Sequence, residues 1–307
     1  MEETKQGIVV ASDGGLYEIY MDTKERVTCK PRGRFRHKSM RLLVGDRVTV
    51  AFDEQGNAVV DQILERNTVL IRPPVANLDV IFVVVSASSP DPIYENVDKL
   101  TAIAEHNRIT PVILITKSDL DGEKASEISK VYQSAGYQVF EAGIFDEQGK
   151  DELKKTIAER FSGKIAAFAG ASGVGKSTLM NGLFSGLDLK TGQVSEKIGR
   201  GKHTTRSVTL FPLSELVSEE FEGFLADTPG FSMLDFENFN FFSLSDLPHN
   251  FPEFEERLGC CKYTKCTHRK EDGCAILELV RRGEIAKSRH DSYSSLYELL
   301  KNKHDWD

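Results

Sequence analysis

Residues 170–178, Gly-Ala-Ser-Gly-Val-Gly-Lys-Ser-Thr, match the pattern G-x-x-x-x-G-K-[ST]. The apolar run Ile165–Ala169 before them predicts a β-strand, and Thr178–Leu183 after them predicts a helix. A loop between a strand and a helix can bind phosphate through its backbone N–H groups and the helix N-terminus. An incidental Gly-rich turn would not need a strand before it and a helix after it. The predicted phosphate loop consists of Gly170, Ala171, Ser172, Gly173, Val174, Gly175, Lys176, Ser177 and Thr178. Lys176 is expected to reach the β- and γ-phosphates, and the Ser177 hydroxyl to bind Mg²⁺.

A second motif, Thr116-Lys117-Ser118-Asp119, follows the apolar run Val112–Thr116 and resembles the N/T-K-x-D guanine box of GTPases. A carboxylate at Asp119 can accept hydrogen bonds from both N1 and N2 of guanine, and adenine offers no such pair of donors. Such a tetrapeptide alone more often marks a solvated strand end. Together with the phosphate loop, it predicts that Thr116, Lys117 and Asp119 bind guanine and that Asp119 sets the base specificity.

A third motif, Asp227-Thr228-Pro229-Gly230, follows the predicted strand Phe224–Ala226 and matches D-x-x-G. Asp227 is expected to hold Mg²⁺ through water, and the Gly230 N–H to face the γ-phosphate. The same four residues would also form a good turn. Their position after the phosphate loop favours the nucleotide-dependent role.

The segment between these motifs, Gly199–Arg206, is the candidate first switch, with Thr205 or else Thr204 on Mg²⁺. Many GTPases carry Gln directly after D-x-x-G to orient the attacking water, but this chain has Phe231, which cannot hydrogen-bond water. We therefore predict slow intrinsic hydrolysis, with the missing group supplied by His203 or by a partner. The alternative is that His203 is a plain surface residue or one that contacts RNA.

The order of the motifs is unusual, because the guanine motif at 116–119 precedes the phosphate loop at 170–178. Ordinary GTPases have the phosphate loop first and the guanine motif last. Circular permutation keeps a site in space while moving the chain ends, which usually lie at the surface and close together. In this arrangement the second switch leads directly into the C-terminal segment, so nucleotide state could move what that segment holds.

Three parts are predicted along the 307 residues. Residues 1–68 alternate short β-type runs with turn signals, as in a small β-barrel. Residues 69–234 alternate apolar strands with amphipathic helices, which indicates an α/β GTPase domain. Residues 235–307 hold a Phe-rich linker, a cysteine cluster and two polar helices. The acidic start is unlike a signal peptide, and no apolar run nears the roughly 20 residues of a membrane span, so we expect a cytoplasmic protein.

The formal charge of −8 argues at first against a nucleic-acid partner, but it is unevenly distributed. Residues 69–256 carry −11, whereas 1–68 are balanced and 257–307 carry +3. Residues 24–41 contain eight basic side chains, one acidic side chain and Phe35, which suits an RNA backbone and a stacked base on a barrel. A solvated loop is the alternative. The predicted RNA-binding residues are Lys30, Arg32, Arg34, Arg36, Lys38 and Arg41.

Four of the five cysteines lie within residues 260–274. Cys261, Cys266, His268 and Cys274 supply three thiolates and an imidazole, a closed tetrahedral set suited to one structural Zn²⁺. Disulfides are disfavoured in a reducing cytosol. From spacing alone, Cys260 could replace Cys261 as a ligand.

A permuted GTPase with an N-terminal barrel and a C-terminal Cys/His cluster resembles the bacterial ribosome small-subunit-dependent GTPase A family. The resemblance covers almost the whole chain, through Gly45–Val48, the four nucleotide motifs and Cys261–His268. It implies an OB-fold barrel, Cys261 as the first zinc ligand, and 30S-stimulated GTP hydrolysis in late small-subunit maturation. The expected partners are GTP, GDP and the 30S subunit with its 16S rRNA, for a monomeric protein that binds no membrane.

Two other classes share some of these features. A metal-delivery GTPase would combine a phosphate loop with cysteines, but it needs a labile ligand set, and the set predicted here is closed. A P-loop kinase or ATPase would use the same phosphate loop without a guanine motif.

Overall fold

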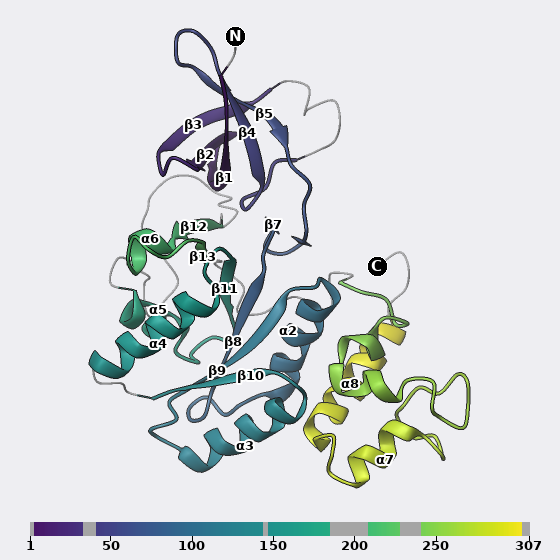
Figure 1. Ribbon diagram of the computed structural model, residues 1–307. Helices are drawn as coiled ribbons and strands as arrows, with labels where there is room; N and C mark the ends of the chain where they lie inside the picture. The colour runs from purple at the N-terminus through teal and green to yellow at the C-terminus, as the bar shows by residue number, and fades with distance from the viewer. Residues whose placement is uncertain (1–2, 33–40, 144–146, 185–207, 228–240, 303–307) are drawn as a thin grey trace. The chain divides into compact units, whose positions relative to one another are not determined.

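The computed structural model describes residues 3–32, 41–143, 147–184, 208–227 and 241–302 (Figure 1). The chain gathers into two compact units, each built from segments far apart in the sequence. The first unit combines Met1–Val80, Glu152–Phe168 and Leu183–Phe231, and the second combines Ile81–Asp151, Ala169–Gly182 and Ser232–Asp307. Within the described ranges, no helix has the length and apolar character to cross a membrane.

Five short strands close into a barrel in the order β1-β2-β3-β5-β4. They are β1 (Glu3–Asp13), β2 (Leu16–Met21), β3 (Arg26–Pro31), β4 (Arg47–Phe52) and β5 (Ala58–Ile63). Val9, Ile19 and Val50 fill the interior and are fully buried, because alternate side chains of a strand point to opposite faces. The predicted barrel is confirmed. Strand β3 was not predicted, and its residues belong to the basic segment 24–41.

The turn before β4 contacts the segment that follows the barrel. This segment includes the short strands β6 (Val69–Leu70) and β7 (Val75–Ala76). Gly45 has a φ of +90°, and a Cβ there would lie 2.0 Å from the Ala76 carbonyl oxygen, so only glycine fits. The buried Asp46 carboxylate accepts hydrogen bonds from Arg66 Nε at 2.6 Å and Arg66 Nη2 at 2.8 Å. The Gly-Asp pair at 45–46 therefore sets the exit of the chain from the barrel.

The barrel also contacts later elements of the first unit, namely β12 (Thr209–Pro212), α6 (Leu213–Leu216) and β13 (Phe224–Asp227). Arg26 of β3 donates to both carboxylate oxygens of Glu215 on α6, at 2.8 and 3.0 Å. The ring of Tyr20 packs edge-on against Phe224, with centroids 5.6 Å apart. Part of the basic segment 24–41 thus makes an intramolecular contact.

The α/β part is one six-stranded sheet in the order β10-β9-β8-β11-β13-β12. Its other strands are β8 (Val80–Ser86), β9 (Thr110–Thr116), β10 (Gln138–Ala142) and β11 (Ile165–Ala169), and its helices are α2 (Tyr94–His106), α3 (Gly122–Ser134), α4 (Glu147–Arg160) and α5 (Lys176–Leu183). Every residue of β8 is buried, as expected for a strand covered on both faces. Strands β8, β9 and β10, the first three of this sheet along the chain, form one side of it, and β11, β13 and β12 form the other. This is the connectivity predicted for a permuted GTPase domain.

A small helical module built around aromatic side chains ends the chain. Its elements are the 3-10 helices η1 (Leu247–Asn250) and η2 (Pro252–Arg257), followed by α7 (Ala275–Arg281) and α8 (Lys287–Lys301). The ring centroids of Phe251, Phe254 and Tyr293 lie 4.9 to 5.4 Å apart. The two predicted polar helices correspond to α7 and α8.

Candidate functional site

The phosphate loop runs from the end of β11 to the start of α5. Gly170 has a φ of +146°, and a Cβ there would lie 2.3 Å from the Val84 carbonyl oxygen. Gly173 and Gly175 have φ values of +81° and +93°, which residues with side chains rarely adopt. The backbone itself therefore requires the three glycines. Helix α5 starts at Lys176, two residues before the predicted start at Thr178, so the last residues of the motif form the helix N-terminus that phosphate binding by backbone N–H groups needs.

Lys176 folds back over this loop. Its Nζ donates hydrogen bonds to the carbonyl oxygens of Gly170 at 2.6 Å and Ala171 at 2.8 Å. Burial lowers the pKa of the Lys176 ammonium group to about 8, because a charge removed from water is less stable. A phosphate beside Nζ would favour the charged form and raise this pKa again.

We expect GDP binding at pH 8 to be accompanied by proton uptake at Lys176. Free protein at a pH near the Lys176 pKa of about 8 holds this lysine about half protonated, and bound phosphate favours the protonated form. Calorimetry in buffers of different ionisation enthalpy should show uptake of roughly half a proton, falling toward zero at about pH 6. Lys176→Arg, whose guanidinium stays charged, should bind GDP without this uptake. Equal uptake by both proteins would assign the proton to another group.

The guanine motif lies at the end of β9, in direct contact with the phosphate loop. Thr116 Oγ1 donates to the Val174 carbonyl oxygen at 2.5 Å. Lys117 has a φ of +58°, and its Nζ donates to the carbonyl oxygens of Gly173, at 3.2 Å, and of Ser89. Two motifs that lie more than 50 residues apart in the sequence thus form one site.

Asp119 lies beside Gly143, which belongs to none of the predicted motifs. A Cβ at Gly143, just after β10, would lie 3.1 Å from Asp119 Oδ1, so a larger residue would crowd the carboxylate. Strand β10 pairs in parallel with β9, with Ala142 opposite Thr116. The signal was present in the sequence, because the carboxyl ends of parallel strands meet at one edge of the sheet, where ligands bind.

Asp227 is the last residue of β13 and is half-buried within the first unit. Burial raises the pKa of its carboxyl group. A cation bound nearby would act in the opposite direction and favour the ionised form. The other predicted switch residues lie outside the described residues: His203, Thr204, Thr205, Gly230 and Phe231.

The predicted RNA-binding residues are only partly within the described ranges. Arg34, Arg36 and Lys38 lie outside them. Lys30 and Arg41 are exposed, while Arg32 pairs with Asp61 at 3.2 Å. The described part of the barrel therefore presents Lys30 and Arg41 to solvent.

Four metal-ligating side chains come together in the C-terminal module. The Sγ atoms of Cys261, Cys266 and Cys274 and a ring nitrogen of His268 all lie within 4.8 Å of one another. The Sγ atoms of Cys261 and Cys274 are 3.8 Å apart, and His268 Nδ1 lies 3.5 and 3.6 Å from them. Tetrahedral zinc, with bonds of about 2.3 Å to sulfur and about 2.0 Å to nitrogen, requires separations of roughly 3.8 and 3.5 Å. The donor set therefore fits zinc, and exposed Cys260 is not part of it.

The loop that carries these ligands is braced by hydrogen bonds. Glu271 accepts the N–H of Thr267 at 2.8 Å. Burial alone would raise the pKa of the Glu271 carboxyl, but this bond and its neighbours lower it to about 2. From α8, His290 Nε2 donates to the His268 carbonyl oxygen at 2.7 Å. The loop is therefore held in place by contacts that do not involve the ligand atoms.

The strand order and the two contacting motifs define the class of this protein: a circularly permuted phosphate-loop GTPase with a barrel before it and a Cys3His module after it. The model of the RsgA N-terminal domain matches residues 6–60, and that of the RsgA GTPase matches residues 63–237. The chain belongs to the RsgA family of small ribosomal subunit biogenesis GTPases.

Individual relatives match over nearly their whole length. The RsgA of Geobacillus kaustophilus is 41% identical over 303 residues, covering 97% of this chain and 98% of the relative, and that of Ruminiclostridium cellulolyticum is 38% identical over 304 residues, covering 96% and 94%. The crystal structure of YjeQ from Thermotoga maritima has a TM-score of 0.82 at 33% identity, covering 98% of this chain and 100% of that one. YloQ, described as a circularly permuted GTPase, has a TM-score of 0.77 at 30% identity, covering 98% and 97%. These matches confirm the permuted fold.

Proposed function

We propose that this protein binds GTP, hydrolyses it to GDP and phosphate, and acts on the 30S ribosomal subunit during late maturation. The observation that carries the proposal is the contact between the guanine motif and the phosphate loop, from Thr116 to Val174 and from Lys117 to Gly173. Relatives named small ribosomal subunit biogenesis GTPases support the 30S subunit as the partner. A base-binding carboxylate held at a set distance from a phosphate loop can select one nucleotide.

Mg²⁺ is the proposed cofactor for hydrolysis. Ser177, Thr205 or Thr204, and Asp227 through water would hold it, and it would neutralise charge developing on the phosphates. Lys176 would bind the β- and γ-phosphates from its position on the loop, and the Gly230 N–H would face the γ-phosphate. Because Phe231 cannot orient water, that role is proposed for His203 or for a group of the ribosome.

One Zn²⁺ per chain is proposed at Cys261, Cys266, His268 and Cys274, where it would stabilise the module. Four protein ligands leave no open coordination position for chemistry. The barrel of residues 1–68 and the module of residues 235–307 are proposed to bind 16S rRNA. They would thereby hold the GTPase domain of residues 69–234 on the 30S subunit. Lys30 and Arg41, both exposed, are the barrel contacts among the described residues. We propose a cytoplasmic monomer.

GTPase turnover with and without purified 30S subunits tests this function. The protein alone should be slow, and 30S subunits should raise turnover at least about tenfold by supplying or ordering the water-positioning group. If several Lys and Arg side chains neutralise rRNA phosphates, 30S affinity should fall on the order of 10³-fold between 50 and 200 mM salt. Equal turnover with and without 30S subunits, or salt-independent binding, would contradict the proposal. In the same assay, a His203→Ala variant whose 30S-stimulated turnover equals that of the wild type would exclude His203 from catalysis.

A further inference from the structure

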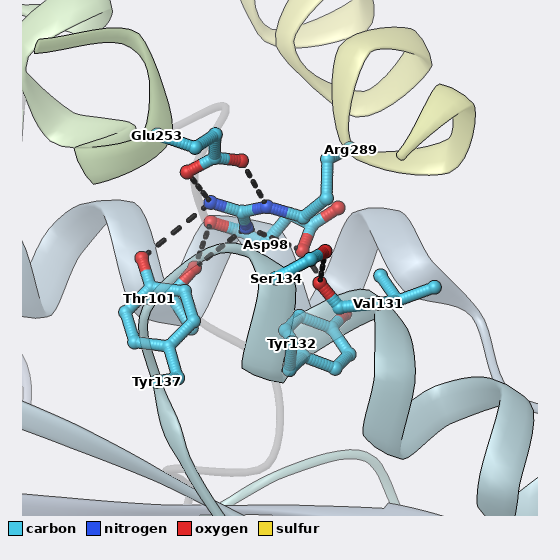
Figure 2. A network of polar contacts seen from close by, with 8 residues as sticks. All are labelled: Asp98, Thr101, Val131, Tyr132, Ser134, Tyr137, Glu253 and Arg289. Atoms are coloured by element: carbon cyan, nitrogen blue, oxygen red, sulfur yellow. Dashed lines mark hydrogen bonds and ion pairs between the residues drawn. The ribbon is translucent and has the colours of Figure 1, made fainter. Parts of the chain in front are cut away.

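Arg289 of α8 is 1% exposed and lies at the centre of a polar network (Figure 2). Its Nη1 donates to Asp98 Oδ1 at 2.7 Å and to Thr101 Oγ1 at 3.2 Å. Its Nε and Nη2 donate to the two carboxylate oxygens of Glu253 at 2.7 and 3.1 Å, and Nη2 also donates to the Tyr137 hydroxyl at 3.4 Å. Each of the five N–H groups of the guanidinium therefore has an acceptor.

The network holds charge in the interior of the second unit. The side chains of Asp98 and Glu253 are 0% and 5% exposed. Burial alone would lower the pKa of Arg289, but these two carboxylates outweigh it and raise that pKa well above its usual value. Apolar side chains would fasten α8 at least as well as a buried ion cluster. The planar guanidinium adds geometric specificity, because its N–H groups hold several acceptors at set positions relative to one another.

Apart from Glu253 on η2, the network around Arg289 draws on three elements of the α/β sheet domain. Asp98 and Thr101 lie on α2. Tyr132, whose hydroxyl donates to Asp98 Oδ1 at 3.0 Å, lies on α3. Tyr137 directly precedes β10. One side chain of the C-terminal module thus joins α2, α3 and β10.

Each of these three elements also adjoins the guanine motif. Helix α2 follows the loop that contains Ser89, whose carbonyl oxygen accepts a hydrogen bond from Lys117. Helix α3 is capped by Asp121, two residues after Asp119. Strand β10 is followed by Gly143, which lies beside the Asp119 carboxylate. Arg289 thus contacts the middle of α2 directly, Tyr137 just before β10, and, through Asp98, Tyr132 near the end of α3, and these same three elements lead to or from the residues around Lys117 and Asp119.

We propose that Arg289 is a positioning residue for the guanine site: it holds α2, α3 and β10 in the arrangement that lets Asp119 accept both guanine N–H groups. This inference rests on the proposed function, because it assumes that Asp119 binds guanine. Arg289 touches no nucleotide and acts through the elements that carry the motif. The C-terminal module is then part of the nucleotide specificity of this GTPase.

Affinities for GDP and inosine diphosphate (IDP) test the proposal in the full-length protein. IDP lacks the 2-amino group, so it forfeits one of the two hydrogen bonds to Asp119. Wild type should bind GDP about 10- to 100-fold more tightly than IDP, the usual effect of one hydrogen bond to a charged group. Arg289→Met should weaken GDP binding by a similar factor and bring the GDP to IDP ratio close to one, because a displaced carboxylate meets only one donor. A merely structural role would weaken both nucleotides equally.

Three further variants keep the test decisive. Arg289→Met combined with Asp98→Asn and Glu253→Gln removes the arginine together with the two carboxylates that pair with it, and it should also lose the GDP to IDP preference. Arg289→Lys keeps the charge without the planar fork and should restore only part of the preference. Arg269→Met is the matched control, because Arg269 lies over the Tyr297 ring of α8, 3.9 Å from its centroid, outside the network, so its ratio should equal that of wild type. A wild-type ratio in the folded triple variant would overturn the inference alone, whereas wild type that binds no GDP would overturn the proposed function and the inference together.

Discussion

Asp119→Asn should change the base preference of this protein from guanine to xanthine. In the proposed site the carboxylate accepts two N–H donors of guanine, but an asparagine amide presents one acceptor and one donor, and its donor would face the guanine amino group. GDP affinity should therefore fall about 10³-fold, as when a site built for a hydrogen bond loses its partner. Xanthosine diphosphate carries a carbonyl oxygen in place of that amino group, so it should bind the variant more tightly than GDP does. Competition against a fluorescent guanine nucleotide measures both affinities.

Asp121→Asn is the matched control for this experiment. Asp121 lies two residues further along and caps α3 by accepting the Lys124 N–H at 2.9 Å, a role that asparagine fills equally well. This variant should keep the wild-type preference for GDP. If Asp119→Asn also kept that preference, another residue would read the base. Competition by ATP as strong as that by GTP in the wild type would instead favour a P-loop kinase or ATPase.

Much of the nucleotide site could be predicted from the sequence because its requirements are local. The φ values of Gly170, Gly173 and Gly175 demand glycine, so the loop leaves a fixed pattern of letters. Strand β11 and residues 112–115 of β9 are apolar and buried, so these strands also stand out in the sequence. The permuted order of the motifs then indicates the connectivity, which the sheet order confirms.

Other features could not be predicted because they depend on contacts between distant segments. Strand β3 was missed because two of its three exposed residues, Arg26 and Lys30, are charged and belong to the basic segment, and only Val27 and Cys29 alternate with them. Nothing near Arg289 in the sequence indicates Asp98, which lies 191 residues away. In the sequence, the Gly-Asp pair at 45–46 was only part of a family resemblance. The fold shows why residue 45 must be glycine, because a side chain there would collide with the Ala76 carbonyl oxygen.

Spacing left Cys260 and Cys261 as alternative zinc ligands, and the geometry of the module now separates these neighbouring residues. Cys261→Ala should remove the metal, because its Sγ belongs to the four-atom cluster. Structural zinc contributes on the order of 10 kcal/mol to folding, and this module has few buried apolar side chains in the ligand loop to replace it. Cys260→Ala alters an exposed side chain outside the cluster and should keep one zinc per chain.

Zinc content and hydrogen exchange together measure this effect. In Cys261→Ala, and in wild type treated with a chelator, amides of residues 259–282 should lose protection, because Cys274 is both a member of the four-residue cluster and the N-cap residue of α7. Amides of β9 and β11 should remain protected, since these strands are buried in the sheet far along the chain from the ligand loop. Loss of zinc from Cys260→Ala would move the first ligand to Cys260. Metal that a chelator removes while residues 259–282 stay protected would mean that zinc does not fold the module, and a labile site of that kind would favour a metal-delivery GTPase.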